Sequence, residues 1–381
     1  MQAKAIDLFL ARCARVALGA REIPEWPGDW EEPDASFLQR ASFHGVALLL
    51  SEAFRGPKPW PRELNERIRE EAGVQRFWET SHRKILEPLL MAFAAADITA
   101  LITKGTALAY SHYPNAAARQ RGDTDILFPT GNRKAVRKVL ASCGFRQVGD
   151  RRPYQEDWLL EDAMGLPHMI DVHWRINASG FLSQALERGG LGSECEPLPG
   201  LCEQANTVGP AENLILTCLN RSLHQEHGYW SDSEKHFEGD RLIWAVDIAL
   251  ITRAFGSDGW ERLLTIARSS GTAPIVLSGL MFAHRTLETA IPEDVIRRLE
   301  TDAGDKRVLD YMSGMSSKSR TLLDLSSSAK WVDKGRVLAS ALFPTSDFIR
   351  ERYPNKTGWP INALRLHRLF DRTIKSVRGQ S

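Results

Sequence analysis

The chain has 381 residues, a formal net charge of +1 and 43% hydrophobic residues. A chain of this length favours two or three packed units, and this apolar content is enough to form a core. A charge so close to zero gives no overall field for nucleic acid or a membrane surface, so electrostatic recognition must come from local patches.

The cysteines and the N-terminal residues point to a reduced, cytoplasmic protein. The five cysteines are odd in number and none forms a C-x-x-C pair, so neither a disulfide framework nor a zinc site is indicated. The N-terminal residues lack the apolar core of a signal peptide. No segment approaches the roughly 20 apolar residues that span a bilayer, and we therefore expect a cytoplasmic protein without a membrane span.

Residues 1–96 are predicted to form an N-terminal helical region. Apolar residues within 4–19 recur at helical spacing, and a proline-rich loop follows them. Residues 35–54 are expected to form a second helix. Residues 61–96 are expected to form a long third one, with Pro61 in its first turn and its apolar residues on one side.

Residues 97–200 change to short strands separated by glycines, and we assign them to an α/β core. A strand at 98–101 is followed by Gly105 and a short helix, an order that can cradle a phosphate. Further strands are expected at 125–128 and 170–176, because these runs are rich in β-branched and aromatic residues. The acidic segment between these two strands is expected to form a hairpin arm.

Residues 201–381 return to helical periodicity and are assigned to a C-terminal helical domain. We expect the polar and aromatic residues 224–239 to form a mobile loop near the site. The tail 350–378 has eight Arg and Lys against two acidic residues, a local charge of +6. It suits a solvated amphipathic helix, and its aromatic residues leave nucleic-acid binding open. The expected helices of this domain lie at 211–225, 240–254, 260–269, 274–290 and 295–300.

An Asp-x-Asp pair, Asp123 and Asp125, is the strongest chemical signal in the chain. Side chains alternate along a strand, so both carboxylates project to the same side. That geometry suits a shared divalent cation, although a solvated strand end would also explain the pair. Aspartate is depleted in strands, and a buried carboxylate needs a partner. We therefore predict that this pair binds metal.

Asp171 and His173 belong to the second β-rich run. Asp171 could supply a third carboxylate from a neighbouring strand, either as a metal ligand or as the base that takes the proton of an acceptor hydroxyl. Strand alternation puts His173 on the same face. We expect it to be a packed or hydrogen-bonded residue that lines the site, and we include it among the nucleotide-binding residues.

Five further residues are candidates for binding a triphosphate. Backbone N–H groups at the turn of Lys104 and Gly105 could bind phosphate oxygens, and the Thr106 hydroxyl could add a hydrogen bond. Arg119 and Arg121 precede the aspartate pair and could neutralise phosphate charge. A Gly-Thr pair after a strand is common by itself, so the prediction depends on the combination.

Two histidines in the C-terminal half form a weaker candidate. His224 and His227 lie one helical turn apart, which permits shared metal binding. A solvated helix end is the simpler interpretation. We find no nucleophile elbow and no Ser-His-Asp order.

Three of these stretches together resemble the bacterial family usually called uncharacterised nucleotidyltransferases: 102–109, 119–128 and 170–174. The resemblance covers most of the chain, since it extends to 43–49, 241–248 and 342–353. The family itself resembles the polymerase-β-like nucleotidyltransferase superfamily.

This resemblance implies an α+β fold, in which a small mixed-sheet nucleotidyltransferase core is flanked by N-terminal and C-terminal helical regions. It implies a turn for the triphosphate, matched by Gly105 and Thr106. Thr106 replaces the commoner Ser or Gly and keeps the hydroxyl. It also implies three metal-binding carboxylates, and the expected cofactor is Mg²⁺, as two ions that Mn²⁺ can replace. The matching carboxylates are Asp123, Asp125 and Asp171.

The activity implied is transfer of a nucleoside monophosphate from an NTP, such as ATP, to a hydroxyl or phosphate of a small molecule or peptide, with release of pyrophosphate. Two alternatives stay open: a non-catalytic nucleotide-binding or scaffold protein, and a nucleotidyltransferase that acts on RNA ends. The intact carboxylates argue against the first, because their mutual repulsion is costly without metal. The near-neutral charge gives no reason to expect a nucleic-acid partner.

Overall fold

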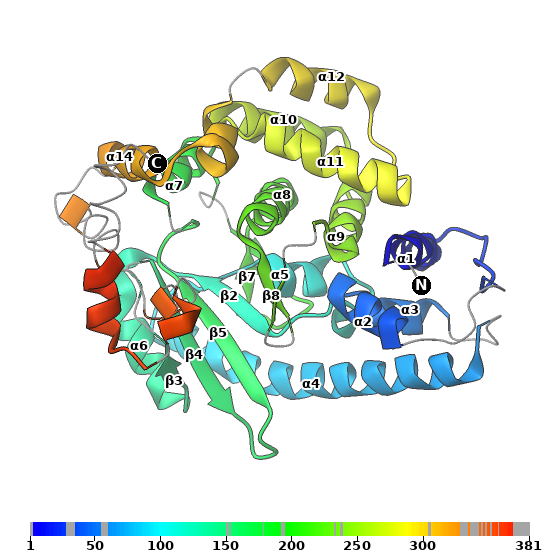
Figure 1. The fold of residues 1–381 in the computed structure, drawn as a ribbon, viewed down its shortest axis with the longest axis horizontal. Helices are drawn as coiled ribbons and strands as arrows, with labels where there is room; N and C mark the ends of the chain where they lie inside the picture. The colour runs from blue at the N-terminus through cyan, green and yellow to red at the C-terminus, as the bar shows by residue number, and fades with distance from the viewer. Residues whose placement is uncertain are drawn as a thin grey trace.

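The structure is a computed structural model. It describes residues 3–27, 35–54, 60–149, 152, 154–177, 179–191, 195–231, 234–236, 239–303, 306–327, 334–335, 343, 346, 349–350, 353–356 and 358–368. The described chain is mostly helical, with one seven-stranded mixed sheet in the middle and helices on both sides (Figure 1). This confirms the predicted α+β class. Much of the basic tail lies outside the described residues.

The N-terminal part is helical, as predicted, but it contains one more helix than expected. A single helix over 35–54 is wrong, because the chain breaks at Gly45, whose φ of +69° lies in the left-handed region that favours glycine. A long helix follows, with Pro61 immediately before its first residue. The helices are α1 (Ala3–Ala17), α2 (Ala35–His44), α3 (Ala47–Ala53) and α4 (Arg62–Ala95).

The central sheet has the strand order β3-β4-β5-β2-β1-β7-β6. Strands β2 and β5 run parallel, whereas β4 pairs with β5 in an antiparallel hairpin that confirms the expected arm. The strand predicted at 98–101 begins only at Leu101. The bounds are β1 (Leu101–Thr103), β2 (Asp123–Leu127), β3 (Arg146–Val148), β4 (Gln155–Glu161), β5 (Pro167–His173), β6 (Glu196–Pro197) and β7 (Asn206–Thr207).

The two faces of this sheet differ in chemistry. Figure 1 shows α4 as the long helix beneath the sheet, and α4 packs with α6 (Arg133–Ser142) against one face. Side chains alternate along each strand, so the residues on either side of each buried apolar residue point to the other face. That other face carries aspartates from three adjacent strands. The apolar face is built by Ile126, Trp158, Ile170 and Val172, which pack on Leu86, Leu89, Phe93, Val136 and Leu140.

Two short helices connect the strands next to this acidic face. Helix α5 (Lys104–Ser111) follows β1 directly, and the one-turn helix η1 (Ala116–Ala118) lies a few residues before β2. The first residue of α5 thus lies where β1 meets β2, since Thr103 pairs with Asp125 across these strands. This places the strand-to-helix turn beside the aspartates.

The C-terminal part is also helical. It contains α7 (Gly180–Arg188), α8 (Pro210–His227), α9 (Leu242–Arg253), α10 (Ser257–Ser270), α11 (Ala273–Leu287), α12 (Glu293–Asp302), α13 (Arg307–Leu309) and α14 (Ser317–Ser327). The expected loop at 224–239 is wrong in part. Helix α8 continues to His227, and the strands β8 (Tyr229–Ser231) and β9 (Glu234–His236) pair in a hairpin.

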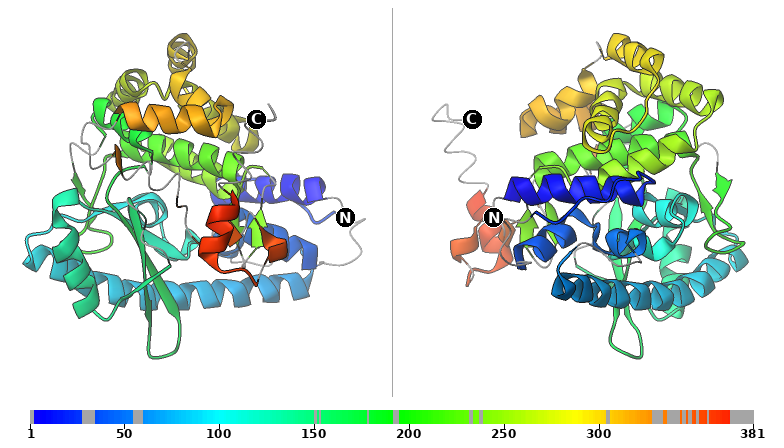
Figure 2. Two further views of the ribbon diagram at one scale, coloured as in Figure 1. Left: turned by 60° about the vertical axis from the view of Figure 1, so that its left-hand side comes forward. Right: turned by 90° about the vertical axis from the view of Figure 1, so that its right-hand side faces the viewer.

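Helix α1 shares one apolar core with helices of the C-terminal half. Phe9 and Leu10 of α1 belong to the same buried cluster as Trp244 and Ile248 of α9. Figure 2 shows α1 lying against the helices of the C-terminal half. The N-terminal helices therefore brace the C-terminal ones, while the far end of α4 braces the sheet.

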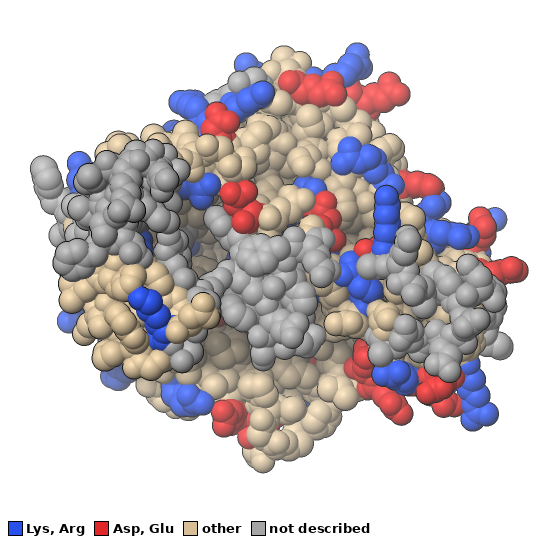
Figure 3. Space-filling view, viewed as in Figure 1, with Lys and Arg blue, Asp and Glu red and all other residues tan. Residues whose placement is uncertain are grey.

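The described surface has no strong charge asymmetry in the view of Figure 3, where Lys and Arg are interspersed with Asp and Glu. This agrees with the near-neutral composition. Among the described helices, none combines the length and the apolar composition needed to span a bilayer.

Candidate active site

The register of β2 and β5 brings the predicted carboxylates together. Asp125 lies directly opposite Asp171 on these two parallel strands. His173 lies two residues further along β5, on the same face. One ligand atom from each of these three residues lies within 4.8 Å of the others. The structure thus assembles a group of two carboxylates and one imidazole that could hold a metal ion.

Asp123 begins β2 and projects to the same face as Asp125, as its spacing predicts. It pairs in register with Met169 and lies outside the group that could hold a metal ion. Its side chain is exposed at the end of the strand. The role of Asp123 as a metal ligand stays a prediction.

Asp125 is buried and held in the charged form. His173 Nε2 lies 2.8 Å from its Oδ1, and the Lys104 ammonium contacts the same oxygen. Burial opposes the charge, but Lys104 and His173 together hold the pKa of Asp125 below its usual range. Asp125 is therefore a carboxylate with two fixed neighbours.

Asp171 has the opposite electrostatics. Burial, followed by the negative charges of Asp123, Asp125 and Asp157, raises its pKa from 3.8 to about 8. The Gln155 amide donates a hydrogen bond to Asp171 Oδ2 at 3.0 Å. A carboxylate with so high a pKa suits either a general base or a group that a cation stabilises.

Lys104 occupies the turn between β1 and α5 in a strained conformation. Its φ of +55° lies in the left-handed region, which non-glycine residues rarely adopt. Burial would lower its pKa, but the charges of Asp125, Asp123 and Asp171 raise it above the usual value. The turn therefore directs a cation toward the carboxylates, and the sequence did not predict this contact.

The sequence and this geometry agree with a comparison against protein families. A family model described as "Uncharacterised nucleotidyltransferase" matches residues 29–288. The chain belongs to this nucleotidyltransferase family. The matched segment includes the turn at Lys104 and all three predicted carboxylates. No curated protein matches the chain.

The Thr106 hydroxyl forms hydrogen bonds within the protein. Thr106 is buried, and its Oγ1 lies 2.9 Å from Thr124 Oγ1 and 3.3 Å from the carbonyl oxygen of Asp123. It also accepts a hydrogen bond from Arg121 Nε at 3.0 Å. These contacts fasten α5 to β2. The predicted contact with phosphate stays a prediction, as it does for Gly105.

Arg119 and Arg121 each pair with a distant acid. Arg119 Nε and Nη2 donate to the two carboxylate oxygens of Asp247 on α9, each at 2.8 Å. Arg121 Nη2 donates to Glu79 on α4, at 2.8 Å. The two pairs anchor the segment before β2 to both helices, and the predicted phosphate contacts of the arginines stay predictions. Asp247 could have been noticed in the sequence, because it interrupts an apolar helix.

A histidine pair lies behind the acidic face. His82 of α4 is fully buried, with Nε2 at 2.7 Å from Thr124 Oγ1 and Nδ1 at 3.2 Å from Nδ1 of His168. Burial, with the positive charge of Arg121, holds the pKa of His82 well below 6.5. A neutral histidine therefore lies next to the strand that carries Asp123 and Asp125.

The end of α8 lies close enough to the site for the charges of Lys104 and Asp125 to affect the pKa of His224. His224 is half-buried, stacks on Trp244 and lies with Nδ1 3.1 Å from the Gly228 carbonyl oxygen. Burial lowers its pKa, and Lys104 and Asp125 act on it electrostatically. His224 is thus not the solvated helix end that the sequence suggested. The side chain of His227 lies outside the described residues.

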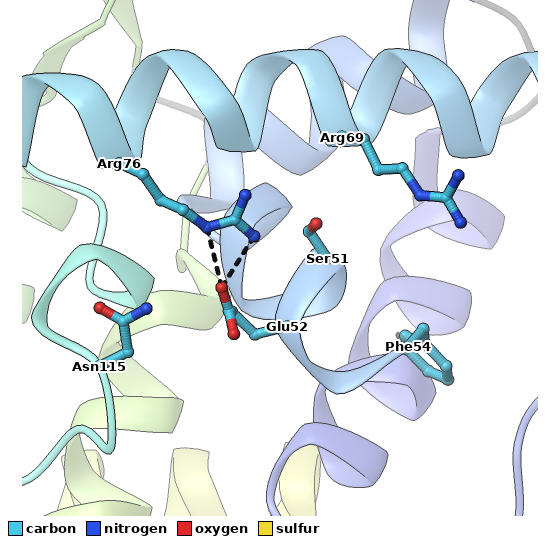
Figure 4. Close-up of a pocket in the computed structure, with 6 residues that line it drawn as sticks. All are labelled: Ser51, Glu52, Phe54, Arg69, Arg76 and Asn115. Atoms are coloured by element: carbon cyan, nitrogen blue, oxygen red, sulfur yellow. Dashed lines mark hydrogen bonds and ion pairs between the residues drawn. The ribbon is translucent and has the colours of Figure 1, made fainter. Parts of the chain in front are cut away.

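A cavity of about 460 Å³ lies elsewhere (Figure 4). It is formed between α3, α4 and the segment before η1, and it is not lined by any of the carboxylates discussed above. Within it Arg76 Nε and Nη2 donate to one oxygen of Glu52, at 3.0 and 2.8 Å. Its lining residues are Ser51, Glu52, Phe54, Arg69, Arg76 and Asn115.

Proposed function

We propose that this family member is a metal-dependent nucleotidyltransferase, which moves a nucleoside monophosphate from an NTP to a hydroxyl or phosphate of a small molecule or peptide. The observation that carries the proposal is the register of β2 and β5. It sets Asp125 against Asp171 on one face, next to the Lys104 turn. Family membership supplies the reaction class.

The donor set fits Mg²⁺ or Mn²⁺. Carboxylate oxygens are the ligands these ions prefer, and the imidazole of His173 also suits Mn²⁺. Asp171 supports this assignment, because its raised pKa reflects negative charges that a cation would offset. Asp125, Asp171 and the exposed Asp123 would hold the metal. A bound divalent ion would neutralise charge on the triphosphate and activate the attacking oxygen.

Residues of the turn would bind the nucleotide. Backbone N–H groups at the start of α5 favour negative charge. The Lys104 ammonium, already directed at Asp125, would lie between that carboxylate and the phosphates. These groups would hold the triphosphate with its α-phosphorus facing Asp125 and Asp171.

Asp171 would act as the base. The acceptor oxygen attacks the α-phosphorus and forms a new P–O bond, while the bond from the α-phosphorus to the bridging oxygen breaks. Pyrophosphate leaves with that bridging oxygen, and the proton of the acceptor hydroxyl passes to Asp171.

Calorimetric titration with ATP, GTP, CTP and UTP tests the proposal. We expect at least one NTP to bind in the presence of Mg²⁺, and Mg²⁺ with NTP to raise the melting temperature more than either alone, because the native state gains a ligand. Asp125→Asn should remove the joint effect. Failure of all four nucleotides to bind with Mg²⁺ present would favour a scaffold role.

A further inference from the structure

A further aspartate, Asp157, extends the group of carboxylates beyond the residues predicted from the sequence. Asp157 on β4 pairs in register with Asp171 on β5, and Asp171 pairs in register with Asp125 on β2. Three adjacent strands therefore place three carboxylates side by side on one face. Only one of the three, Asp125, has direct contacts with a lysine and a histidine.

Gln155 connects two members of this row. Its Nε2 donates to Asp171 Oδ2 at 3.0 Å and to Asp157 Oδ1 at 3.1 Å. An amide nitrogen carries two hydrogens, so both are used. The carbonyl oxygen of the same side chain accepts from Arg152 Nη1 at 3.3 Å. The amide therefore has a single orientation, with its nitrogen toward the carboxylates.

Arg152 completes the arrangement. Its Nη2 donates to Asp157 Oδ2 at 2.8 Å. Asp157 is thus paired with an arginine, whereas the donor described for Asp171 is the neutral amide of Gln155. In a metal site, such outer hydrogen bonds fix the orientation of the ligating carboxylate.

We propose that Gln155 is a positioning residue of the metal site: it fixes the carboxylate of Asp171 so that an oxygen faces Asp125 and His173, while Arg152 and Asp157 fix Gln155. This inference rests on the proposed function and goes beyond it, because it assigns a role to β4. Gln155 touches neither nucleotide nor acceptor in this assignment. It acts only through Asp171.

Titration of the metal-free full-length protein with Mn²⁺ tests this role. Electron paramagnetic resonance measures the free ion and also reports the coordination symmetry of the bound ion. We expect Gln155→Ala and Gln155→Leu each to weaken Mn²⁺ binding by ~10- to 100-fold, the usual effect of losing an outer partner. The spectrum of the bound ion should change, and the melting temperature of the metal-free protein should stay near that of the wild type.

Arg146→Ala is the matched control. Arg146 on β3 forms an exposed ion pair with Glu161, at the far end of β4, with Nη2 3.1 Å from Oε1. Its removal disturbs β4, the strand that also carries Gln155, without touching the carboxylate row. This variant should bind Mn²⁺ as the wild type does and give the same spectrum.

The outcomes separate this inference from the proposed function. If the wild type binds Mn²⁺ and Asp125→Asn does not, but both Gln155 variants keep the affinity and spectrum of the wild type, only the role of Gln155 is wrong. A fall in metal-free melting temperature that parallels the loss of affinity would make Gln155 a purely structural residue. A wild type that binds no Mn²⁺ overturns the metal site and this inference with it.

Discussion

Arg119 and Asp247 form a two-fold ion pair that joins the segment before β2 to helix α9. Both side chains are buried, and the Tyr113 hydroxyl donates a further hydrogen bond to Asp247 Oδ1 at 2.7 Å. The two residues are 128 positions apart in the chain. The position of the aspartate pair therefore depends on a helix of the C-terminal half.

Asp247→Asn tests the importance of this pair for stability. The substitution leaves the Arg119 guanidinium buried without a counter-charge, and breaking a buried pair in this way costs about 3–5 kcal/mol. Denaturant unfolding of the two proteins measures the difference. Glu261→Gln, which removes an exposed ion pair with Arg298, is the control and should change little. A small effect of Asp247→Asn would show that water or a rearranged side chain replaces the carboxylate.

Asp125→Asn and Asp171→Asn should change stability in opposite directions, although the residues face each other. Asp125 is stabilised as a carboxylate by Lys104 and His173, so its neutralisation should lower the melting temperature of the metal-free protein. Burial and the neighbouring negative charges disfavour the ionised form of Asp171 in the folded protein, so Asp171→Asn should raise the melting temperature, by roughly 2 °C or more. Both variants should lose nucleotidyl transfer. Differential scanning calorimetry without metal measures the two shifts, and equal shifts would contradict the electrostatic assignment.

The raised pKa of Asp171 also predicts a pH dependence. The folded protein holds a proton on Asp171 up to about pH 8, whereas an unfolded aspartate releases it near 3.8. The native state therefore binds more protons in this interval, and the contribution of Asp171 to stability falls as pH rises from about 4 to 8. The gain in melting temperature of Asp171→Asn over the wild type should grow over the same interval. A constant gain would contradict the raised pKa.

His82 predicts the opposite trend at lower pH. Burial lowers the pKa of His82 well below 6.5. Just below pH 6.5, His82 is therefore protonated in the unfolded chain and neutral in the folded chain. The contribution of His82 is present above about pH 6.5 and is lost as pH falls below it. His82→Gln should melt lower than the wild type at pH 8, and the gap should narrow toward pH 5. A gap that stays constant would place the pKa of His82 near its ordinary value.

Lys104 allows backbone strain and charge to be separated. Lys104→Gly removes both the ammonium and the cost of a left-handed non-glycine residue, which is about 1 kcal/mol, whereas Lys104→Met removes only the ammonium. The glycine variant should therefore be the more stable of the two. Both should bind NTP at least ~10-fold more weakly, if the ammonium contacts phosphate. Calorimetry on both variants measures stability and affinity, and unchanged NTP binding would exclude Lys104 from the nucleotide site.

Local patterns in the sequence were enough for part of this structure. Strand alternation correctly placed Asp123 and Asp125 on one face, and Asp171 with His173 on one face. The acidic segment before Ile170 indicated the hairpin, whose second strand carries Asp171. These features depend on side-chain periodicity, which short segments encode by themselves.

Features that depend on contacts across the fold were not predicted. The exact pairing of Asp125 with Asp171 is a register between strands, and the partners of the two arginines lie on α4 and α9. The break at Gly45 was missed because the apolar pattern continues on both sides of it. The hairpin after α8 was missed because a polar, aromatic segment is also typical of a loop. In the same way, the sequence indicates only an acidic arm where Asp157 and Gln155 lie.

The same strand register builds both the apolar core and the acidic row. A shift of β5 by one residue would turn Ile170 and Val172 away from α4 and α6, and would turn Asp171 toward them. The burial of the two aliphatic side chains therefore fixes the register of β5, and with it the position of the Asp171 carboxylate. A chain that has formed its core has also aligned Asp171 with its neighbours, and a single inserted residue in this strand would abolish both together.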